Sequence, residues 1–160
     1  MDDLQNYLRI LADTLSQKEQ VLGQILILTR TQSELAEHDE LDEMAFSNSV
    51  NEKEVLIARI NQLDDGFTSI YERIRQDVID QGGLYDTEIR KMQEQIKSCV
   101  GIGNEIRVLE ERNHAKLTGH FASKKEAYKV KANANSAARS YHQAMTGGQY
   151  HASAFMDQKK

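Results

Sequence analysis

Apolar residues recur along residues 3–37, mostly at steps of three, four and seven. The set consists of Leu4, Leu8, Leu11, Leu15, Leu22, Ile25 and Leu35. Residues three and four apart lie on one face of an α-helix, so this spacing predicts an amphipathic helix with a heptad seam. A helix of about 34 residues would be roughly 50 Å long. Val21, Leu26 and Ile27 widen the apolar stripe, which indicates contact with more than one neighbouring element.

The same spacing returns in a second segment, for which we predict a helix over residues 39–80. Its seam consists of Leu56, Ile60, Leu63, Phe67, Ile70, Ile74 and Val78. Asp39 can cap the start of this helix, with Asp42 at the third helical position. The paired glycines Gly82 and Gly83 provide a C-cap and a turn at its end.

A third helix is predicted from residue 84 to at least residue 121. Its seam contains Ile89, Met92, Ile96, Cys99, Ile106, Leu117 and Phe121, with either Leu109 or Asn113 between Ile106 and Leu117. Gly101 and Gly103 interrupt the pattern, and together they cost roughly 2 kcal/mol of helix propensity relative to alanine. Two readings follow: either the helix kinks or breaks here with Asn104 as a new cap, or it continues and the glycines admit a close neighbour.

Composition agrees with long helices. The 160 residues contain no proline, no tryptophan, four phenylalanines and six tyrosines, with 28% charged and 39% apolar residues. Proline is excluded from helix interiors, and so little aromatic bulk suits narrow seams between slender helices. We therefore predict an all-α fold, an elongated antiparallel bundle of about three long helices in residues 1–121, followed by a C-terminal segment, 122–160.

The C-terminal segment differs in charge from the rest of the chain. Residues 1–111 hold 11 Lys/Arg and 23 Asp/Glu, whereas residues 112–160 hold 9 Lys/Arg and 2 Asp/Glu. We expect a short helix over 137–145, an end at Gly147-Gly148 and a flexible tail over 149–160 in the free protein. This tail still carries Tyr150, Phe155 and Met156. Such anchors are typical of a segment that folds on binding; docking on the chain's own bundle is the alternative.

No pattern for catalysis, cofactor binding or metal binding emerges. There is no G-x-S-x-G element and no phosphate-binding loop, and no two of the five histidines are spaced i, i+4. Cys99 lies on a seam, where a cysteine acts as a small apolar residue. The basic stretch 116–131 has no helix-turn-helix pattern, and the acidic body would repel nucleic-acid phosphates. We predict a binding protein, not an enzyme, with no cofactor and no nucleic-acid partner.

Targeting features are equally sparse. The acidic start lacks a signal-peptide core. No stretch reaches the ~20 apolar residues of a membrane span. The single cysteine suits a reducing compartment. We therefore expect a soluble, cytoplasmic protein that does not insert into membranes.

Several segments together resemble one family, the FlgN-type flagellar export chaperones. The first helix is similarly rich in Leu and Gln. Lys53-Glu-Val-Leu-Ile57 and Ile60-Asn-Gln-Leu-Asp64 resemble its K-E-x-L-I and I-x-x-L-D patterns, and Leu109-Glu-Glu-Arg-Asn113 with Leu117 resembles its L-x-x-x-N-x-x-x-L element. The end of the chain is the most similar part. Tyr141-His-Gln-Ala-Met-Thr-Gly147 and Ala154-Phe-Met-Asp-Gln-Lys-Lys160 look like the Y-x-x-x-M-x-G and F-M-D-K-K-K termini of Gram-positive members, with Gln158 in place of the usual lysine.

The resemblance implies a function. FlgN-type chaperones bind hook-associated (hook–filament junction) proteins in the cytoplasm, keep them export-competent and deliver them to the flagellar type III export gate. Their C-terminal part binds the client. Carried onto this chain, that role falls on Tyr141, Ala144, Met145, Tyr150, Phe155 and Met156.

Two alternatives remain open at this point. The related FliT-type chaperones are also helical. A structural coiled-coil protein, whose seams serve self-association, would show the same heptads. The seams alone do not decide between a monomer and a homodimer, and they do not identify the client.

Overall fold

A computed structural model of the chain describes residues 3–122, and the regular secondary structure in this range is entirely helical. The long helices are α1 (Asp3–Glu37), α2 (Glu43–Gln81) and α3 (Asp86–Phe121), and a short 3-10 helix, η1 (Gly82–Tyr85), joins the last two. The predicted all-α class is confirmed for these residues. None of the helices in this range combines the length and the apolar character that a membrane span requires.

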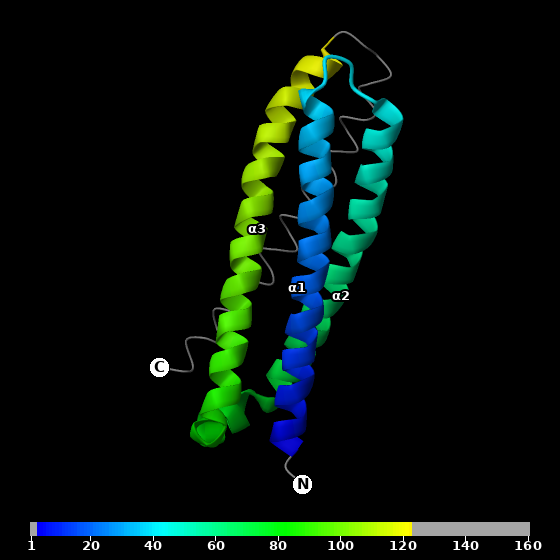
Figure 1. Cartoon of the computed structure of the whole chain (residues 1–160). Helices are drawn as coiled ribbons and strands as arrows, with labels where there is room; N and C mark the ends of the chain where they lie inside the picture. Colours follow the sequence, from blue (N-terminus) through cyan, green and yellow to red (C-terminus); the bar gives the residue numbers. More distant parts are fainter. Residues whose placement is uncertain (1–2, 123–160) are drawn as a thin grey trace.

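The helices lie lengthwise beside one another, with connections at opposite ends (Figure 1). At one end, Leu4 to Leu15 of α1 pack with Phe67 to Val78 of α2 and with Ile89 to Ile96 of α3. At the other end, Ala36 of α1 packs with Phe46 and Val50 of α2 and with Leu117 of α3. Helices α1 and α3 therefore run in the same direction, and α2 runs opposite to both.

Each helix contributes a seam of buried side chains that alternates steps of three and four. Along α1 the buried residues are Leu4, Leu8, Leu11, Leu15, Lys18, Leu22, Ile25, Thr29, Gln32 and Ala36. Along α2 the seam runs through Phe46, Val50, Lys53, Ile57, Ile60, Phe67, Tyr71, Ile74 and Val78, with Asp64 at the position between Ile60 and Phe67. Along α3 it runs through Ile89, Met92, Ile96, Cys99, Gly103, Ile106, Asn113 and Leu117, with Glu110 between Ile106 and Asn113. The seams are thus regular, but they include polar residues at heptad positions.

Three predicted seam positions are corrected by one residue. Ile57 is buried instead of Leu56, Tyr71 instead of Ile70, and Ala36 instead of Leu35; the replaced residues are partly buried beside the seam. In each case the predicted position was the residue immediately before the buried one. The true register becomes visible only when the polar positions are included in the heptad count.

Helix α3 passes through Gly101 and Gly103 without a break. The predicted alternative of a break with Asn104 as a new cap is therefore wrong. Gly103 is buried on the seam, whereas Gly101 is exposed. Packing of Cys99 and Ile106 on either side holds the helix together, and this tertiary packing outweighs the unfavourable propensity of the two glycines.

The start of α2 also differs from the prediction. The helix begins at Glu43, not at 39, and its N-cap is Asp42, whose carboxylate accepts a hydrogen bond of 3.0 Å from the Ala45 backbone N–H. One of the otherwise unpaired N–H groups of the first turn is satisfied in this way. Asp39 lies outside the helix in the exposed connection.

The backbone of the turn between α2 and α3 has negative φ angles throughout. Gly82 has φ −57°, and no glycine among the described residues has a positive φ. Gly82 is the C-cap of α2, as predicted, but its backbone is right-handed and not left-handed. The chain continues through the 3-10 helix, so α3 begins at Asp86 and not at 84.

The three helix pairs do not pack equally closely. The backbone of α1 lies close to both α2 and α3 along its length, whereas α2 and α3 scarcely approach each other. In Figure 1, α1 accordingly lies between the other two.

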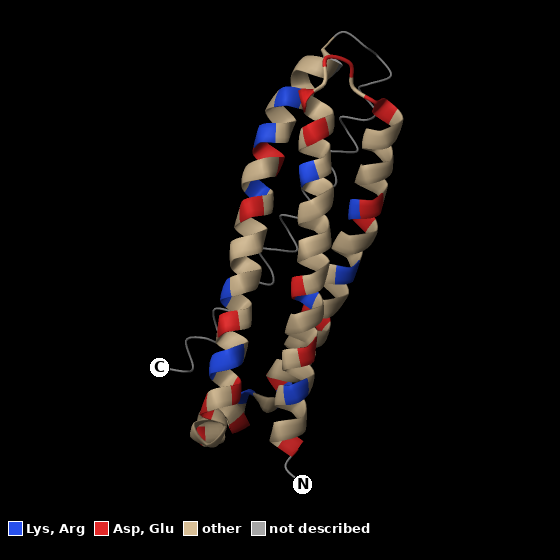
Figure 2. Cartoon of the chain, in the orientation of Figure 1, with Lys and Arg blue, Asp and Glu red and all other residues tan. Residues whose placement is uncertain are grey.

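Charged residues of both signs are distributed along all three helices, and an acidic connection joins α1 to α2 (Figure 2).

Candidate functional site

The predicted client-binding residues lie outside the part of the chain that the structure describes. They are Tyr141, Ala144, Met145, Tyr150, Phe155 and Met156. Their assignment stays a prediction, and so do the expected short helix over 137–145 and the flexible tail. The described residues offer two other features: a buried polar network near the α1–α2 connection, and a groove between α1 and α3.

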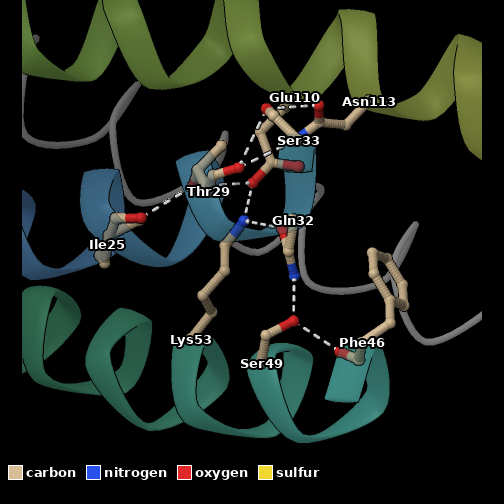
Figure 3. Close-up of polar contacts among 9 residues, drawn as sticks. All are labelled: Ile25, Thr29, Gln32, Ser33, Phe46, Ser49, Lys53, Glu110 and Asn113. Carbon is tan, nitrogen blue, oxygen red and sulfur yellow. Dashed lines mark hydrogen bonds and ion pairs between the residues drawn. The ribbon is translucent and has the colours of Figure 1, made fainter. Parts of the chain in front are cut away.

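Lys53 of α2 is at the centre of the polar network (Figure 3). Its ammonium group donates a hydrogen bond of 2.9 Å to Gln32 Oε1 of α1 and forms an ion pair with Glu110 of α3. The side chain of Lys53 is 3% exposed and that of Glu110 is 18% exposed. The lysine therefore joins all three helices at one level of the bundle.

The amide of Gln32 orders the neighbouring turn of α2. Gln32 Nε2 donates 2.9 Å to the hydroxyl of Ser49, and this hydroxyl donates 2.5 Å to the carbonyl of Phe46 in the preceding turn. Both amide atoms of Gln32 are thus used, one for Lys53 and one for Ser49. The amide orientation is fixed by these two partners.

The polar side chains on the α3 side of the network also have hydrogen-bond partners. Asn113 Nδ2 donates 3.1 Å to the backbone carbonyl of Thr29, and Ser33 Oγ donates 2.7 Å to Asn113 Oδ1. The hydroxyl of Thr29 lies 2.8 Å from the carbonyl of Ile25 and 3.5 Å from Glu110 Oε1. Buried polar groups cost free energy unless they are paired, so this pairing makes the network compatible with the core.

Burial dominates the electrostatics of Lys53. Removal of the ammonium group from water lowers the pKa of Lys53 from 10.5 to about 7. The Glu110 carboxylate acts in the opposite direction, because it favours the charged ammonium, but the desolvation is the larger effect.

A second polar layer lies near the middle of the bundle. Lys18 Nζ of α1 lies 2.8 Å from Asp64 Oδ1 of α2, and the two side chains are 10% and 16% exposed. Cys99 of α3 is buried close by, and desolvation raises the pKa of its thiol to about 11; Lys18 lowers this value, while Glu19 and Asp64 raise it. The predicted role of Cys99 as a small apolar seam residue agrees with this environment.

The chemistry available at these layers is limited. A lysine with a pKa near 7 can in principle act as a base or nucleophile. Here, however, the ammonium is enclosed by Gln32 and Glu110 in a side chain that is 3% exposed, so no substrate atom can approach it. No group of residues within 3–122 has the composition and geometry to hold a metal ion. The layers are better suited to fix the helix register, because a shifted register would bury these polar groups without partners.

A groove of about 890 Å³ lies between α1 and α3, near the end of the bundle that carries η1. Leu8 and Ala12 contribute apolar surface from α1, and Arg9, Arg90, Lys91 and Glu94 contribute charged side chains. Two heptads after Ala12, the equivalent position of α1 is the larger residue Leu26, which is partly buried against the core cluster that contains Ile25 and Ile106.

The chain matches no protein-family model, no curated protein and no solved structure. The resemblance to the FlgN-type chaperones is therefore carried by the sequence motifs alone.

Sequence inspection had not predicted a polar network at Lys53, Gln32, Thr29 and Glu110. Lys53 and Glu110 had been named only within motifs of the family resemblance, and Thr29 and Gln32 had not been singled out. A signal was present: continuing the alternation of four and three from Ile25 gives Thr29, Gln32 and Ala36, and continuing it from Ile57 towards the N-terminus gives Lys53 and Val50.

Proposed function

We propose that this chain is a cytoplasmic FlgN-type export chaperone, which binds hook-associated flagellar proteins and keeps them competent for the type III export gate. The observation that carries the proposal is the distribution of family-like motifs over α2, α3 and the end of the chain. The all-α architecture of residues 3–122 is compatible with it. The proposed protein binds its client without catalysis and without a cofactor, and a FliT-type chaperone belongs to the same functional class.

The packing of the seams supports a client-binding protein over a self-associating coiled coil. A coiled-coil oligomer uses its heptad seam to bind other chains. Here the seams of α1, α2 and α3 pack against one another within one chain, and even their polar members have partners in cis. Within residues 3–122, the exposed large apolar residues are scattered, on positions such as Ile27, Met44, Val55 and Leu84, and do not form a second seam.

We propose the C-terminal segment as the client interface. Aromatic and methionine side chains supply much of the affinity at protein interfaces, and methionine adapts to varied partners. Tyr141, Met145, Tyr150, Phe155 and Met156 provide such anchors, and Ala144 permits close approach. A helical client would present an apolar stripe to them, as in other helix-recognition complexes.

Calorimetry with purified hook-associated proteins of the same organism tests this function. We expect one of them to bind the full chain with an approximately 1:1 stoichiometry. Substitution of Tyr141 or Met145 by alanine should weaken binding by about tenfold or more, which corresponds to about 1.4 kcal/mol. His142→Ala and Gln143→Ala are matched controls, because these residues lie in the same segment but are not assigned as anchors.

Two outcomes would contradict the proposal. If deletion of residues 138–160 leaves the affinity unchanged, the client does not use these anchors. If no hook-associated protein binds, and sedimentation shows that the chain alone forms a stable oligomer, the structural coiled-coil function is correct instead.

A further inference from the structure

The buried apolar residues within residues 3–122 form three separate clusters. The first cluster, at the end of the bundle that carries η1, has eleven buried members. The second, in the middle, has six. The third cluster, beside the α1–α2 connection, has four: Ala36, Phe46, Val50 and Leu117. The apolar core is therefore interrupted along the helices, and its smallest part lies at one end.

The polar network around Lys53 separates the third cluster from the second. Each helix contributes two buried or half-buried polar residues to this layer, and we call the following six residues the Lys53 layer: Thr29 and Gln32 on α1, Ser49 and Lys53 on α2, and Glu110 and Asn113 on α3 (Figure 3). The layer is thick, because Ala36 follows Ile25 by eleven residues and Leu117 follows Ile106 by eleven, and eleven helical residues span roughly 16 Å.

A polar layer resists separation of the helices less than an apolar layer does. Its groups regain hydrogen bonds with water when the helices part, so the net gain from their pairing in the closed state is small. Separation also returns the Lys53 ammonium and the Glu110 carboxylate to water, which removes the desolvation penalty of the buried pair. The lowered pKa of Lys53, about 7, is a consequence of the same desolvation.

Beyond the Lys53 layer, the polar links between helices lie at or near the surface. Lys116 pairs with Glu37 through side chains that are 43% and 63% exposed, and such exposed pairs contribute little to stability. His120 Nε2 lies 2.9 Å from the backbone carbonyl of Ala36. Among the described residues, this end is therefore held by four buried apolar side chains and by weak links, whereas the opposite end has eleven.

We propose that the bundle has a built-in conformational device, an end that opens at the Lys53 layer while the rest stays folded. The opening unit consists of residues 29–54, which include the α1–α2 connection, and residues 109–120 of α3. These residues separate and close together, because they share one small cluster and one polar layer. Opening exposes Phe46, Val50 and Leu117, which the closed bundle buries. The device needs no client and is independent of the proposed function.

Hydrogen exchange of the full chain, followed by NMR at increasing urea concentrations below the unfolding transition, tests the device. The probes in the opening unit are the amides of residues 34–36, 50–54 and 113–117. The matched probes at the opposite end are the amides of residues 8–15, 71–78 and 92–96. We expect the first set to share one opening equilibrium, with a weaker urea dependence than global unfolding and exchange at least about tenfold faster than the second set.

Replacement of the layer by apolar residues gives a second readout. The triple variant Gln32→Leu/Lys53→Met/Glu110→Leu makes the second and third clusters continuous. Protection of the opening unit should then increase by about tenfold or more, towards that of the opposite end.

A matched control removes an exposed ion pair between α1 and α3. Arg30 and Glu105 pair at 2.7 Å, with side chains that are 56% and 49% exposed. Arg30→Met/Glu105→Leu should change the protection of the opening unit by less than about threefold.

Three results would overturn the device. One is exchange of both probe sets through global unfolding alone. Another is a graded series of rates that decreases inward from the helix ends, since this is ordinary fraying and not a common opening. The third is a folded triple variant whose opening unit exchanges as in the natural chain. If the triple variant does not fold, the urea series of the natural chain decides between the first two results and a common opening.

Discussion

Lys53 of α2 and Glu110 of α3 form an ion pair across the one edge of the bundle where the two backbones do not pack closely. Both residues occupy heptad positions that apolar side chains fill elsewhere in the seams. The pair is therefore a specific link between α2 and α3, and its energetic role can be measured directly.

Removal of the carboxylate should be costly. Glu110→Ala leaves the buried ammonium of Lys53 with Gln32 as its remaining acceptor, and we expect a loss of about 3 kcal/mol in the free energy of unfolding. Urea unfolding at pH 6, where the lysine is protonated, measures this loss. The double variant Lys53→Met/Glu110→Leu should lose much less, because it removes both charges.

An exposed ion pair is the matched control. Lys116 pairs with Glu37, with side chains that are 43% and 63% exposed. Glu37→Ala should therefore change the unfolding free energy by no more than about 0.5 kcal/mol. Equal losses for Glu110→Ala and Glu37→Ala would show that burial of the Lys53–Glu110 pair has no energetic consequence.

Stability should rise with pH above neutrality because of Lys53. Burial lowers the pKa of Lys53 from 10.5 in the unfolded chain to about 7 in the folded chain. Between these values the unfolded state holds a proton that the folded state lacks, so raising the pH favours folding, by up to about 1.4 kcal/mol per pH unit. Below pH 7 both states are protonated, and this dependence disappears.

The lysine's contribution is isolated by comparison with Lys53→Met. We expect the unfolding free energy of the natural chain, minus that of the variant, to increase from pH 7 to pH 9. The subtraction removes the contribution of other titrating groups that the substitution leaves unchanged. An identical pH dependence of the two proteins would show that Lys53 keeps its ordinary pKa in the folded chain.

The heptad pattern predicted the helices well wherever apolar residues fill it. Leu4, Leu8, Leu11 and Leu15 are all buried, as expected, and so are Ile74 and Val78. The same method failed at Lys53 and Glu110, because a polar residue on a seam cannot be distinguished from one on a solvated face without knowledge of its partner.

Glycines and caps were the other source of error. Helix propensity alone allowed a break at Gly101 and Gly103, but the packing of Cys99 and Ile106 overrides it. The Asp39 assignment failed for a different reason. Several acidic residues precede α2, and only the backbone geometry selects the one whose carboxylate reaches an N–H group. The predicted client-binding residues depend on the family resemblance and on no feature of residues 3–122.

Cys99 should react slowly in the folded protein. Its thiol is buried, and desolvation raises its pKa to about 11, so little thiolate is present or accessible at pH 8. We expect a disulfide reagent such as Ellman's reagent to modify the folded chain far more slowly than the chain in guanidinium chloride. Equal rates in the two conditions would show that α3 opens readily at the level of Cys99.

Asp42 should contribute more to stability than Asp39. Asp42 accepts the Ala45 N–H at 3.0 Å and lies at the positive end of the α2 dipole, so Asp42→Ala should cost about 1 kcal/mol. Asp39→Ala removes the same charge from the same exposed connection but removes no cap, and it should cost a few tenths of a kcal/mol at most. Urea unfolding at moderate salt measures the loss of unfolding free energy in both variants. Salt screens the general effect of removing an acidic charge, so the difference between the two losses reports the hydrogen bond of the cap. If the two losses are equal, the cap is not formed in solution; if Asp39→Ala costs more, α2 begins earlier, near residue 39, as the sequence pattern alone suggested.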